Sequence, residues 1–197
     1  MGRLLRISTD RLSLRPFTIM DIDRLQALWT QPDMRRFLWD DVIISRDRAA
    51  DEVERSPKCR PAWHRILGDR VSERKRSTRF LRFSVDRPRT KIELVYGLER
   101  AYWGKGLATE ASRAALVWLW NSTGYSCVYA RTDPPNEKSI AVMQRLGMRS
   151  DSASPTLISY VLDRISEKET VNLAEAGRKV PAERCRREPN DELPERK

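Results

Sequence analysis

The sequence predicts an α/β fold, because strands and helices alternate along the best-patterned part of the chain. Ile92–Leu98 alternates large apolar residues with polar or smaller ones, which is the period of a half-buried strand. Leu107–Asn121 then carries alanines and a tryptophan spaced three and four residues apart, the period of a helix. Ser126–Thr132 is rich in strand-forming residues, and an apolar stripe at helical spacing follows between Asn136 and Gly147. This order of elements is typical of an α/β domain.

The other predicted elements are shorter and lie towards the two ends of the chain. Arg11–Phe17 alternates and then meets a proline, which predicts a short strand. Asp21–Trp29 has helical spacing with acids in its first turn, and Pro32 breaks that pattern. A second helix is expected over Ser45–Arg55, with the serine as N-cap, and Thr156–Leu162 predicts a last strand.

The composition indicates a soluble globular domain, with 40% hydrophobic and 34% charged residues in a chain of 197. No apolar run approaches the roughly 20 residues of a membrane helix, and no signal-peptide core follows the basic N-terminus. Three scattered cysteines suit reduced thiols in the cytoplasm. Because His64 is the only histidine, a His-rich metal site and most histidine-based triads are disfavoured. We therefore expect a cytoplasmic protein that holds no metal.

The positive charge is concentrated in one segment. The net charge is +10, and residues 55–91 contain thirteen lysines and arginines against three acids, so the rest of the chain is neutral overall. Basic residues interleaved with aromatic ones are compatible with a phosphate-binding patch for nucleic acid. A solvated basic loop explains the same residues without a partner, and no recognised nucleic-acid-binding module accompanies them. We favour the loop, so nucleic acid is not an expected partner.

Secondary structure is hardest to predict between residues 60 and 89. The run around Ile66 suits one strand and Phe80–Val85 another, although neither alternates cleanly. Arg70–Arg79 has a single apolar residue and is expected to form a solvated loop. Residues 166–197 are mostly charged with few aromatic side chains, so a disordered tail is expected there.

A glycine pair between a strand and a helix is the strongest local signal. Gly104 and Gly106 precede the helix at Leu107; such glycines let the backbone approach an anion while free amides of the helix start point at it. A Walker A loop is excluded because Glu99 and Gly106 stand where it needs glycine and serine or threonine. A dinucleotide-binding loop is doubtful because Thr109 stands at its third small residue. The pair alone also fits an ordinary glycine turn.

Two sequence blocks carry a resemblance to a known family. The first is Glu93–Leu98 (ELVYGL) followed by Tyr102–Ala111 (YWGKGLATEA); the second is Thr132–Asn136 (TDPPN) followed by Ser139–Met148 (SIAVMQRLGM). With these blocks the chain resembles GNAT-superfamily N-acetyltransferases, specifically the RimJ/RimL-like branch of ribosomal-protein N-terminal acetyltransferases. The resemblance implies a mixed, mostly antiparallel sheet with helices on both faces and splayed central strands. It also implies one acyltransferase domain over residues 8–165.

The resemblance further implies that acetyl-CoA is the co-substrate and that an amine is the acceptor. The glycine loop should hold the CoA pyrophosphate with its amides, and the strand before it should pair with the pantetheine arm. Residues expected to contact the cofactor are Leu94, Val95, Tyr96, Ala101, Trp103, Gly104, Lys105, Gly106, Leu107, Ala108, Thr109, Asn136 and Ser139. The last two should lie near the sulfur, although helix capping alone would also explain them.

Direct transfer from a thioester to an amine needs a base for the amine and stabilisation of the leaving thiolate. Glu93 lies in an apolar strand, where burial would raise its pKa, and the resemblance implies a glutamate base on this strand that acts through water. A solvent-facing strand position explains Glu93 as well. Many family members carry a tyrosine acid in the second helix; Met143 occupies that stretch here, so Ser139 is the best substitute. A backbone amide of the strand, such as that of Val95, would be the oxyanion donor.

Residues 60–89 depart from the family pattern. Members carry there a Gly-aromatic strand and an Ile-Gly-x-x-Gly-Leu strand, and this sequence has neither motif. Loss of both strands would damage the centre of the sheet and leave CoA binding with weak or no transfer; a segment translated out of frame would explain the departure. The alternative functions are therefore a catalytically impaired GNAT-like protein and a basic nucleic-acid-binding protein. The acceptor, and the choice between monomer and homodimer, stay open.

Overall fold

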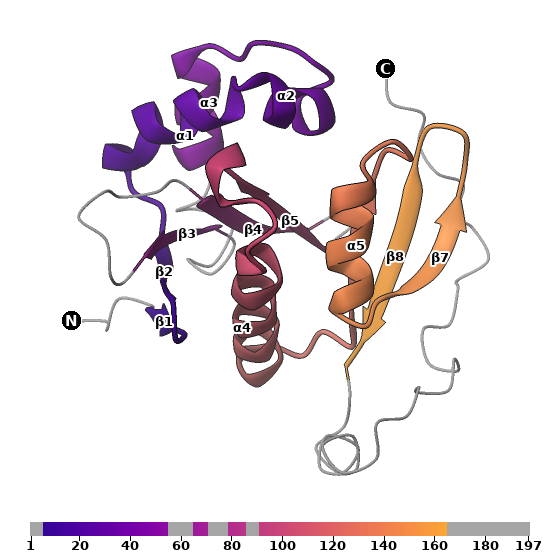
Figure 1. Ribbon diagram of the computed structural model, residues 1–197. Helices are drawn as coiled ribbons and strands as arrows, with labels where there is room; N and C mark the ends of the chain where they lie inside the picture. The colour runs from indigo at the N-terminus through magenta and orange to yellow at the C-terminus, as the bar shows by residue number, and fades with distance from the viewer. Residues whose placement is uncertain (1–5, 55–64, 71–78, 86–90, 165–197) are drawn as a thin grey trace.

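The computed structural model describes residues 6–54, 65–70, 79–85 and 91–164. These residues build an eight-stranded sheet in the order β1-β2-β3-β4-β5-β6-β8-β7 (Figure 1). The strands are β1 Ile7–Ser8, β2 Leu12–Pro16, β3 Arg65–Arg70, β4 Arg79–Val85, β5 Ile92–Leu98, β6 Cys127–Thr132, β7 Arg149–Ala153 and β8 Ile158–Asp163. Only β5 and β6 pair in parallel, and every other neighbouring pair is antiparallel. The mixed, mostly antiparallel sheet is therefore confirmed.

Helices cover both faces of the sheet, as expected. The described helices are η1 Ile19–Asp21, α1 Ile22–Trp29, α2 Pro32–Leu38, α3 Arg46–Glu54, η3 Arg100–Tyr102, α4 Leu107–Ser122 and α5 Glu137–Arg145. In Figure 1, α1, α2 and α3 gather at one end, above the β3–β5 part of the sheet, while α4 and α5 stand below and beside it. Phe80 of β4 is buried with the α1–α3 group, whereas its neighbour Leu81 is buried with α4. Alternate residues of β4 therefore serve two separate hydrophobic clusters.

Strand β5 lies near the middle of the sheet and also contributes to both clusters. Leu94 and Leu98 are buried against α4, and Val95 packs on the opposite side with the α1–α3 group. Gly97 makes the closest approach, because a Cβ built there would come within 2.4 Å of the Phe80 ring and 2.6 Å of the Met34 sulfur. Any larger residue at this position would have to displace the Phe80 ring and the end of the Met34 side chain.

The arginine-rich segment supplies two strands to the centre of the sheet. Strand β4 pairs with β5 along its whole length, from Arg79↔Leu98 to Val85↔Ile92, and β3 joins it to β2. The expectation that missing strands damage the sheet centre is therefore wrong. The two runs around Ile66 and over Phe80–Val85 do form strands, as predicted. In β4 the alternation is obscured because consecutive apolar residues, Phe80 and Leu81, are buried on opposite faces of the strand.

Several described elements have no counterpart among the sequence predictions: the short β1, η1 and η3, the helix α2 and the strand β7. Pro32 was expected to break the preceding helical pattern, and α1 does end at Trp29, but a new helix, α2, begins at Pro32. Proline is favoured at the first helical position because its missing N–H needs no partner there. The polar strand β7 pairs only with β8, and a one-sided edge strand needs little apolar patterning. Residues 1–5, 55–64, 71–78, 86–90 and 165–197 lie outside the described residues; they include His64, most of the loop expected over Arg70–Arg79 and the expected tail. Within the described ranges, no helix has the length and apolar character needed to cross a membrane.

Candidate active site

The sheet opens between its two parallel strands. Strands β5 and β6 share a single register pair, Glu93↔Tyr129. Beyond that pair β5 continues to Leu98 beside β4, while β6 continues to Thr132 beside β8. The facing edges of β5 and β6 therefore diverge, and their backbone groups have no ladder partner across the gap. Such an opening offers a partner strand position to an extended ligand.

A glycine loop lies at the end of β5 beside this gap. Gly104 and Gly106 both adopt the left-handed conformation, with φ of 72° and 73°. A Cβ at Gly104 would meet no protein atom within 4 Å, so the loop faces open space. Helix α4 begins at Leu107, and the first amides of a helix have no partner within it. These amides and the helix dipole make the loop a site suited to an anion.

A pair of charged side chains holds this loop against the start of the chain. Arg11 donates from Nη1 to the carbonyl of Lys105 at 2.9 Å and from Nε to Glu110 at 2.6 Å. Glu110 also accepts hydrogen bonds from the Thr9 hydroxyl and the Arg11 backbone amide. Burial alone would raise the pKa of Glu110, but the bonds from Thr9 and Arg11 outweigh it and lower that pKa. The loop carbonyl is thereby turned towards Arg11.

The first turn of α5 faces the gap from the other side. Asn136 caps the helix, accepting from the Ser139 amide at 3.3 Å, so the capping role considered for Asn136 is present. Tyr96 of β5 reaches across to Ser139, donating from its hydroxyl to the Ser139 carbonyl at 3.0 Å. The two hydroxyl oxygens of Tyr96 and Ser139 are 2.9 Å apart. Burial raises the pKa of Tyr96 to about 12, against the opposing effect of its bond with Ser139.

A second contact crosses the gap next to the first. The ammonium group of Lys138 lies 4.0 Å from the ring centroid of Trp103, and the Trp103 indole donates to the Leu98 carbonyl at 2.9 Å. A cation held this close to an aromatic face is attracted to it. Lys138 therefore places positive charge beside the glycine loop, which sequence patterns did not reveal.

Glu93 lies at the vertex where the two strands part. Arg131 of β6 binds it in a bidentate ion pair, with Nη2 2.7 Å and Nε 3.2 Å from the two carboxylate oxygens. The Glu93 side chain is 20% exposed and that of Arg131 is 32% exposed, so the pair is reached by water. Strand alternation puts Glu93 on the face of Val95, opposite Tyr96. The structure thus joins Ser139 to Tyr96 and Glu93 to Arg131, and these two pairs flank the gap from opposite faces of β5.

Comparisons with known proteins identify the family and the fold. Residues 11–149 match the acetyltransferase (GNAT) domain family. The chain belongs to the GNAT family. The protein named uncharacterized N-acetyltransferase p20 of Bacillus licheniformis is 25% identical over 147 residues, which cover 73% of this chain and 82% of that protein.

Solved structures show the same GNAT fold at low identity. A GNAT-family acetyltransferase from Bacillus anthracis has a TM-score of 0.68 at 18% identity, covering 81% of this chain and 98% of the other. RimL, a ribosomal L7/L12 α-N-protein acetyltransferase in complex with coenzyme A, has a TM-score of 0.65 at 13% identity, covering 81% of this chain and 98% of RimL.

Within this GNAT domain, the predicted cofactor residues differ in their exposure to solvent. Leu94, Leu107 and Thr109 are buried, so a ligand in the gap would meet their backbone and not their side chains. Ala101, Lys105 and the two glycines are exposed, and Val95, Ala108, Asn136 and Ser139 are half-buried. Sequence reasoning missed Arg11, Lys138 and Arg131, which contact predicted residues, and Glu110, which holds Arg11. Each of these contacts joins positions at least 35 residues apart along the chain, so no local sequence pattern predicts it.

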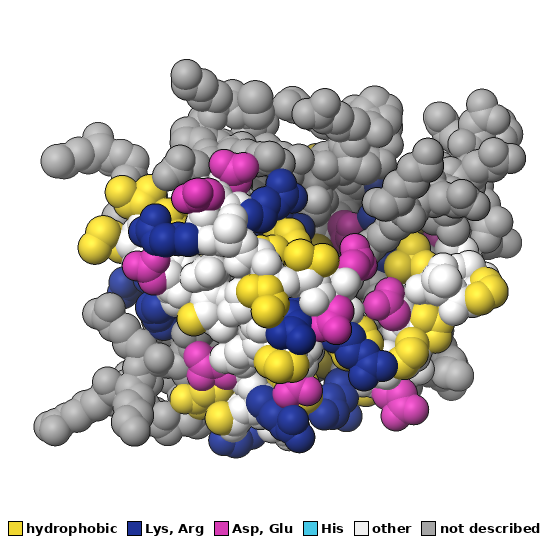
Figure 2. Space-filling model, turned by 90° about the horizontal axis from the view of Figure 1, so that it is seen from above, with side chains coloured by type: hydrophobic (Ala, Val, Ile, Leu, Met, Phe, Trp, Pro, Cys, Tyr) yellow, Lys and Arg dark blue, Asp and Glu magenta, His cyan; other side chains and the backbone are white. Residues whose placement is uncertain are grey.

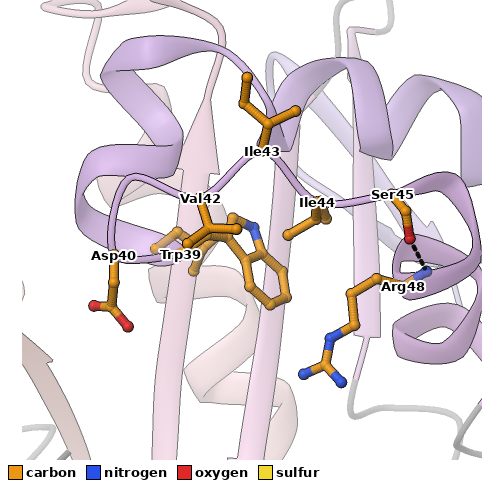
Figure 3. A pocket seen from close by; sticks show the side chains of 8 residues that line it. Trp39, Asp40, Val42, Ile43, Ile44, Ser45 and Arg48 are labelled. Carbon is orange, nitrogen blue, oxygen red and sulfur yellow. Dashed lines mark hydrogen bonds between the residues drawn. The ribbon is translucent and has the colours of Figure 1, made fainter. Parts of the chain in front are cut away.

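An open groove lies elsewhere in the GNAT domain, away from the gap between β5 and β6. It measures about 620 Å³ and follows the connection from α2 to α3, where the side chains of Trp39, Val42 and Ile44 line it (Figure 3). Asp40 and Arg48 lie at its two ends, and Ser45 accepts a bond from the Arg48 amide at 3.1 Å. No predicted site residue lines this groove.

Proposed function

We propose that the chain is an acetyl-CoA-dependent N-acetyltransferase that moves an acetyl group directly to an amine. The observation that carries this proposal is the divergence of β5 and β6 beside a left-handed glycine loop at the start of α4. An extended thioester arm and a pyrophosphate need these two features side by side: an unpaired strand edge and a set of free amides. The membership of the GNAT family supports the same reaction.

The residues of this chain fit coenzyme A. Open space above Gly104 leaves room for a phosphate group where any side chain would intrude. The amides of residues 101–109 would hold the pyrophosphate, with the cation of Lys138 nearby on the Trp103 ring. The edge of β5 from Leu94 to Leu98 would pair with the pantetheine arm. Asn136 and Ser139, at the first turn of α5, would lie towards the sulfur.

Acetyl-CoA supplies an acetyl group activated as a thioester. The acceptor nitrogen attacks the carbonyl carbon, a C–N bond forms, the C–S bond breaks, and the electron pair leaves on sulfur. We assign the proton lost by the nitrogen to Glu93, through water, because its carboxylate lies at the vertex of the gap and is reached by solvent. The Val95 amide would bind the carbonyl oxygen as its charge grows, and Ser139 would bond the departing sulfur. No covalent intermediate on the protein is needed.

The finer placement is the RimJ/RimL-like branch, with a protein N-terminus or a small-molecule amine as acceptor. The sequence blocks at Tyr102–Ala111 and Ser139–Met148 support this branch, and the RimL neighbour acetylates a protein α-amine according to its name. A nucleic-acid-binding role has weaker support. In Figure 2, which looks down on the α1–α3 end, acidic side chains are interspersed among the basic ones of the described residues, so these residues do not form a uniform basic patch on that face.

A binding experiment separates the two functions. Acetyl-CoA at a hundredfold excess over its Kd should stabilise the folded chain by about 3 kcal/mol and so raise its melting temperature. Calorimetry should give one binding site per chain. Single-stranded RNA and duplex DNA at the same concentration should leave the melting temperature unchanged. Stabilisation by nucleic acid but not by acetyl-CoA would reverse the proposal.

A further inference from the structure

The Tyr96 side chain makes a contact that the proposed reaction does not yet use. It leaves β5 three residues beyond the last pairing with β6 and ends on the first turn of α5. Its hydroxyl contacts both the carbonyl and the hydroxyl of Ser139, at 3.0 and 2.9 Å. Tyr96 therefore crosses the gap in which the thioester arm would lie, and it ends on the residue assigned to the sulfur.

The number of protons on the two hydroxyl groups limits the hydrogen bonds that Tyr96 and Ser139 can make. A tyrosine hydroxyl has one proton to donate, and so has a serine hydroxyl. When Tyr96 donates to the Ser139 carbonyl, the Ser139 hydroxyl donates back to Tyr96. When Tyr96 donates to the Ser139 hydroxyl oxygen, the Ser139 O–H no longer donates to Tyr96 and is free to donate a hydrogen bond to another acceptor. The second arrangement turns Ser139 into a donor aimed away from Tyr96.

Burial keeps the tyrosine neutral throughout this rearrangement. The pKa of Tyr96 is raised to about 12. That value is more than three units above the roughly 8.5 of a cysteine-like thiol, so a thiolate would not take the Tyr96 proton. The tyrosine is thus suited to hold a hydrogen bond and unsuited to act as the general acid.

We infer that Tyr96 is the positioning residue that aims the Ser139 hydroxyl at the departing sulfur of CoA. This inference rests on the proposed function. As the C–S bond breaks, negative charge collects on sulfur, and the Ser139 proton turns from Tyr96 to that sulfur while Tyr96 donates to the Ser139 oxygen. No proton leaves either side chain. The thiolate departs hydrogen-bonded and takes its proton from water. Tyr96 of β5, acting through Ser139, would thus serve the role that the resemblance assigns to a tyrosine in the helix and that this chain lacks there.

The test measures the ionisation of bound CoA itself, and it needs no acceptor. A donor to the sulfur stabilises the thiolate, so the thiol of CoA bound to the wild-type protein should ionise at lower pH than in a variant without that donor. Absorbance of the thiolate is titrated with saturating CoA on the wild-type protein, Tyr96→Phe, Ser139→Ala and the double variant. A hydrogen bond to a charged sulfur predicts about a tenfold larger ionisation constant in the wild-type complex than in either single variant.

Three further readouts distinguish positioning from a structural role. The double variant should behave as Ser139→Ala alone, because Tyr96 acts only through Ser139. Acetyl-CoA, whose sulfur bears no charge, should bind Tyr96→Phe as it binds the wild-type protein. Tyr160→Phe removes the same hydroxyl from a tyrosine of β8 that packs against the hydrophobic cluster containing Met143 of α5, and it should leave the titration of the bound CoA thiol unchanged.

Two results would overturn the inference. Equal thiol ionisation in the wild-type and Tyr96→Phe complexes removes the positioning role while leaving CoA binding intact. A further loss in the double variant beyond Ser139→Ala means that Tyr96 acts on sulfur directly. Failure of both CoA and acetyl-CoA to bind the wild-type chain would instead refute the proposed function, and the inference with it.

Discussion

Replacing Gly104 by valine separates the cost of a strained backbone from the loss of a phosphate site. Gly104 has φ of 72°, and a Cβ there would meet no protein atom within 4 Å. Gly147, which follows α5, has φ of 82° and equally open surroundings. The two glycines are therefore matched in conformation and space, but only Gly104 lies in the loop beside the gap. Gly147→Val is thus the control for strain alone.

The magnitudes follow from these geometries. A left-handed conformation costs a residue with a Cβ about 1–2 kcal/mol, so each variant should lose about that much stability and melt about 2–8 °C lower. In Gly104→Val the new side chain also occupies the open space above the loop. Losing two charge-assisted hydrogen bonds to phosphate, at about 1.5–3 kcal/mol each, predicts at least about a hundredfold weaker CoA binding. Gly106→Val should behave in the same way.

Calorimetry with CoA, beside thermal melts of each variant, measures both quantities. We expect similar melting temperatures for Gly104→Val and Gly147→Val but a large difference in CoA affinity between them. Wild-type CoA affinity in folded Gly104→Val would refute the assignment of the loop to the pyrophosphate. Equal loss of affinity in Gly147→Val would mean that strain, and not the position of the loop, weakens binding.

Two further predictions concern charged groups. Glu93→Gln should lower turnover most at low pH, with little change in acetyl-CoA affinity, because at high pH more acceptor amine is already neutral; a wild-type pH profile would leave Glu93 a strand residue only. Burial alone would raise the pKa of Asp21, but hydrogen bonds from Arg15 and Thr18 outweigh it, and the pKa is lowered. This carboxylate stabilises the fold above about pH 4, and its contribution is lost as pH falls through the lowered value. Asp21→Asn should therefore cost about 2 kcal/mol in urea unfolding at pH 7 and progressively less below pH 4; an equal cost at both would contradict the coupling.

The elements around the candidate site were predictable because their patterns are local. Alternation defines β5, the glycine pair marks its end, and three-to-four spacing defines α4, all within Ile92–Ser122. The observed bounds of β5 match the predicted strand. The cap at Asn136 and the left-handed Gly147 likewise place α5.

The rest depends on contacts that no window of sequence contains. Strand β4 lacks clean alternation because its two faces are buried in different hydrophobic clusters. Arg11 reaches Glu110 across 99 positions, and Tyr96 reaches Ser139 across 43, so tertiary pairing alone brings these groups together. The position of Glu93 in an apolar strand suggested a buried base. In the structure Glu93 forms an ion pair with Arg131, which the strand pattern could not indicate.

The most direct measurement is acetyl transfer by the chain as it stands. Acetyl-CoA is incubated with the full protein and pooled amines, comprising peptides with free N-termini in one pool and polyamines and amino sugars in another. Release of CoA thiol is followed beside mass spectrometry of the acceptors. We expect thiol release above the protein-free rate in at least one pool, matched by acceptors heavier by one acetyl group and abolished in Gly104→Val. Background thiol release in both pools, from a protein that binds acetyl-CoA, would contradict catalysis and favour the impaired GNAT-like alternative.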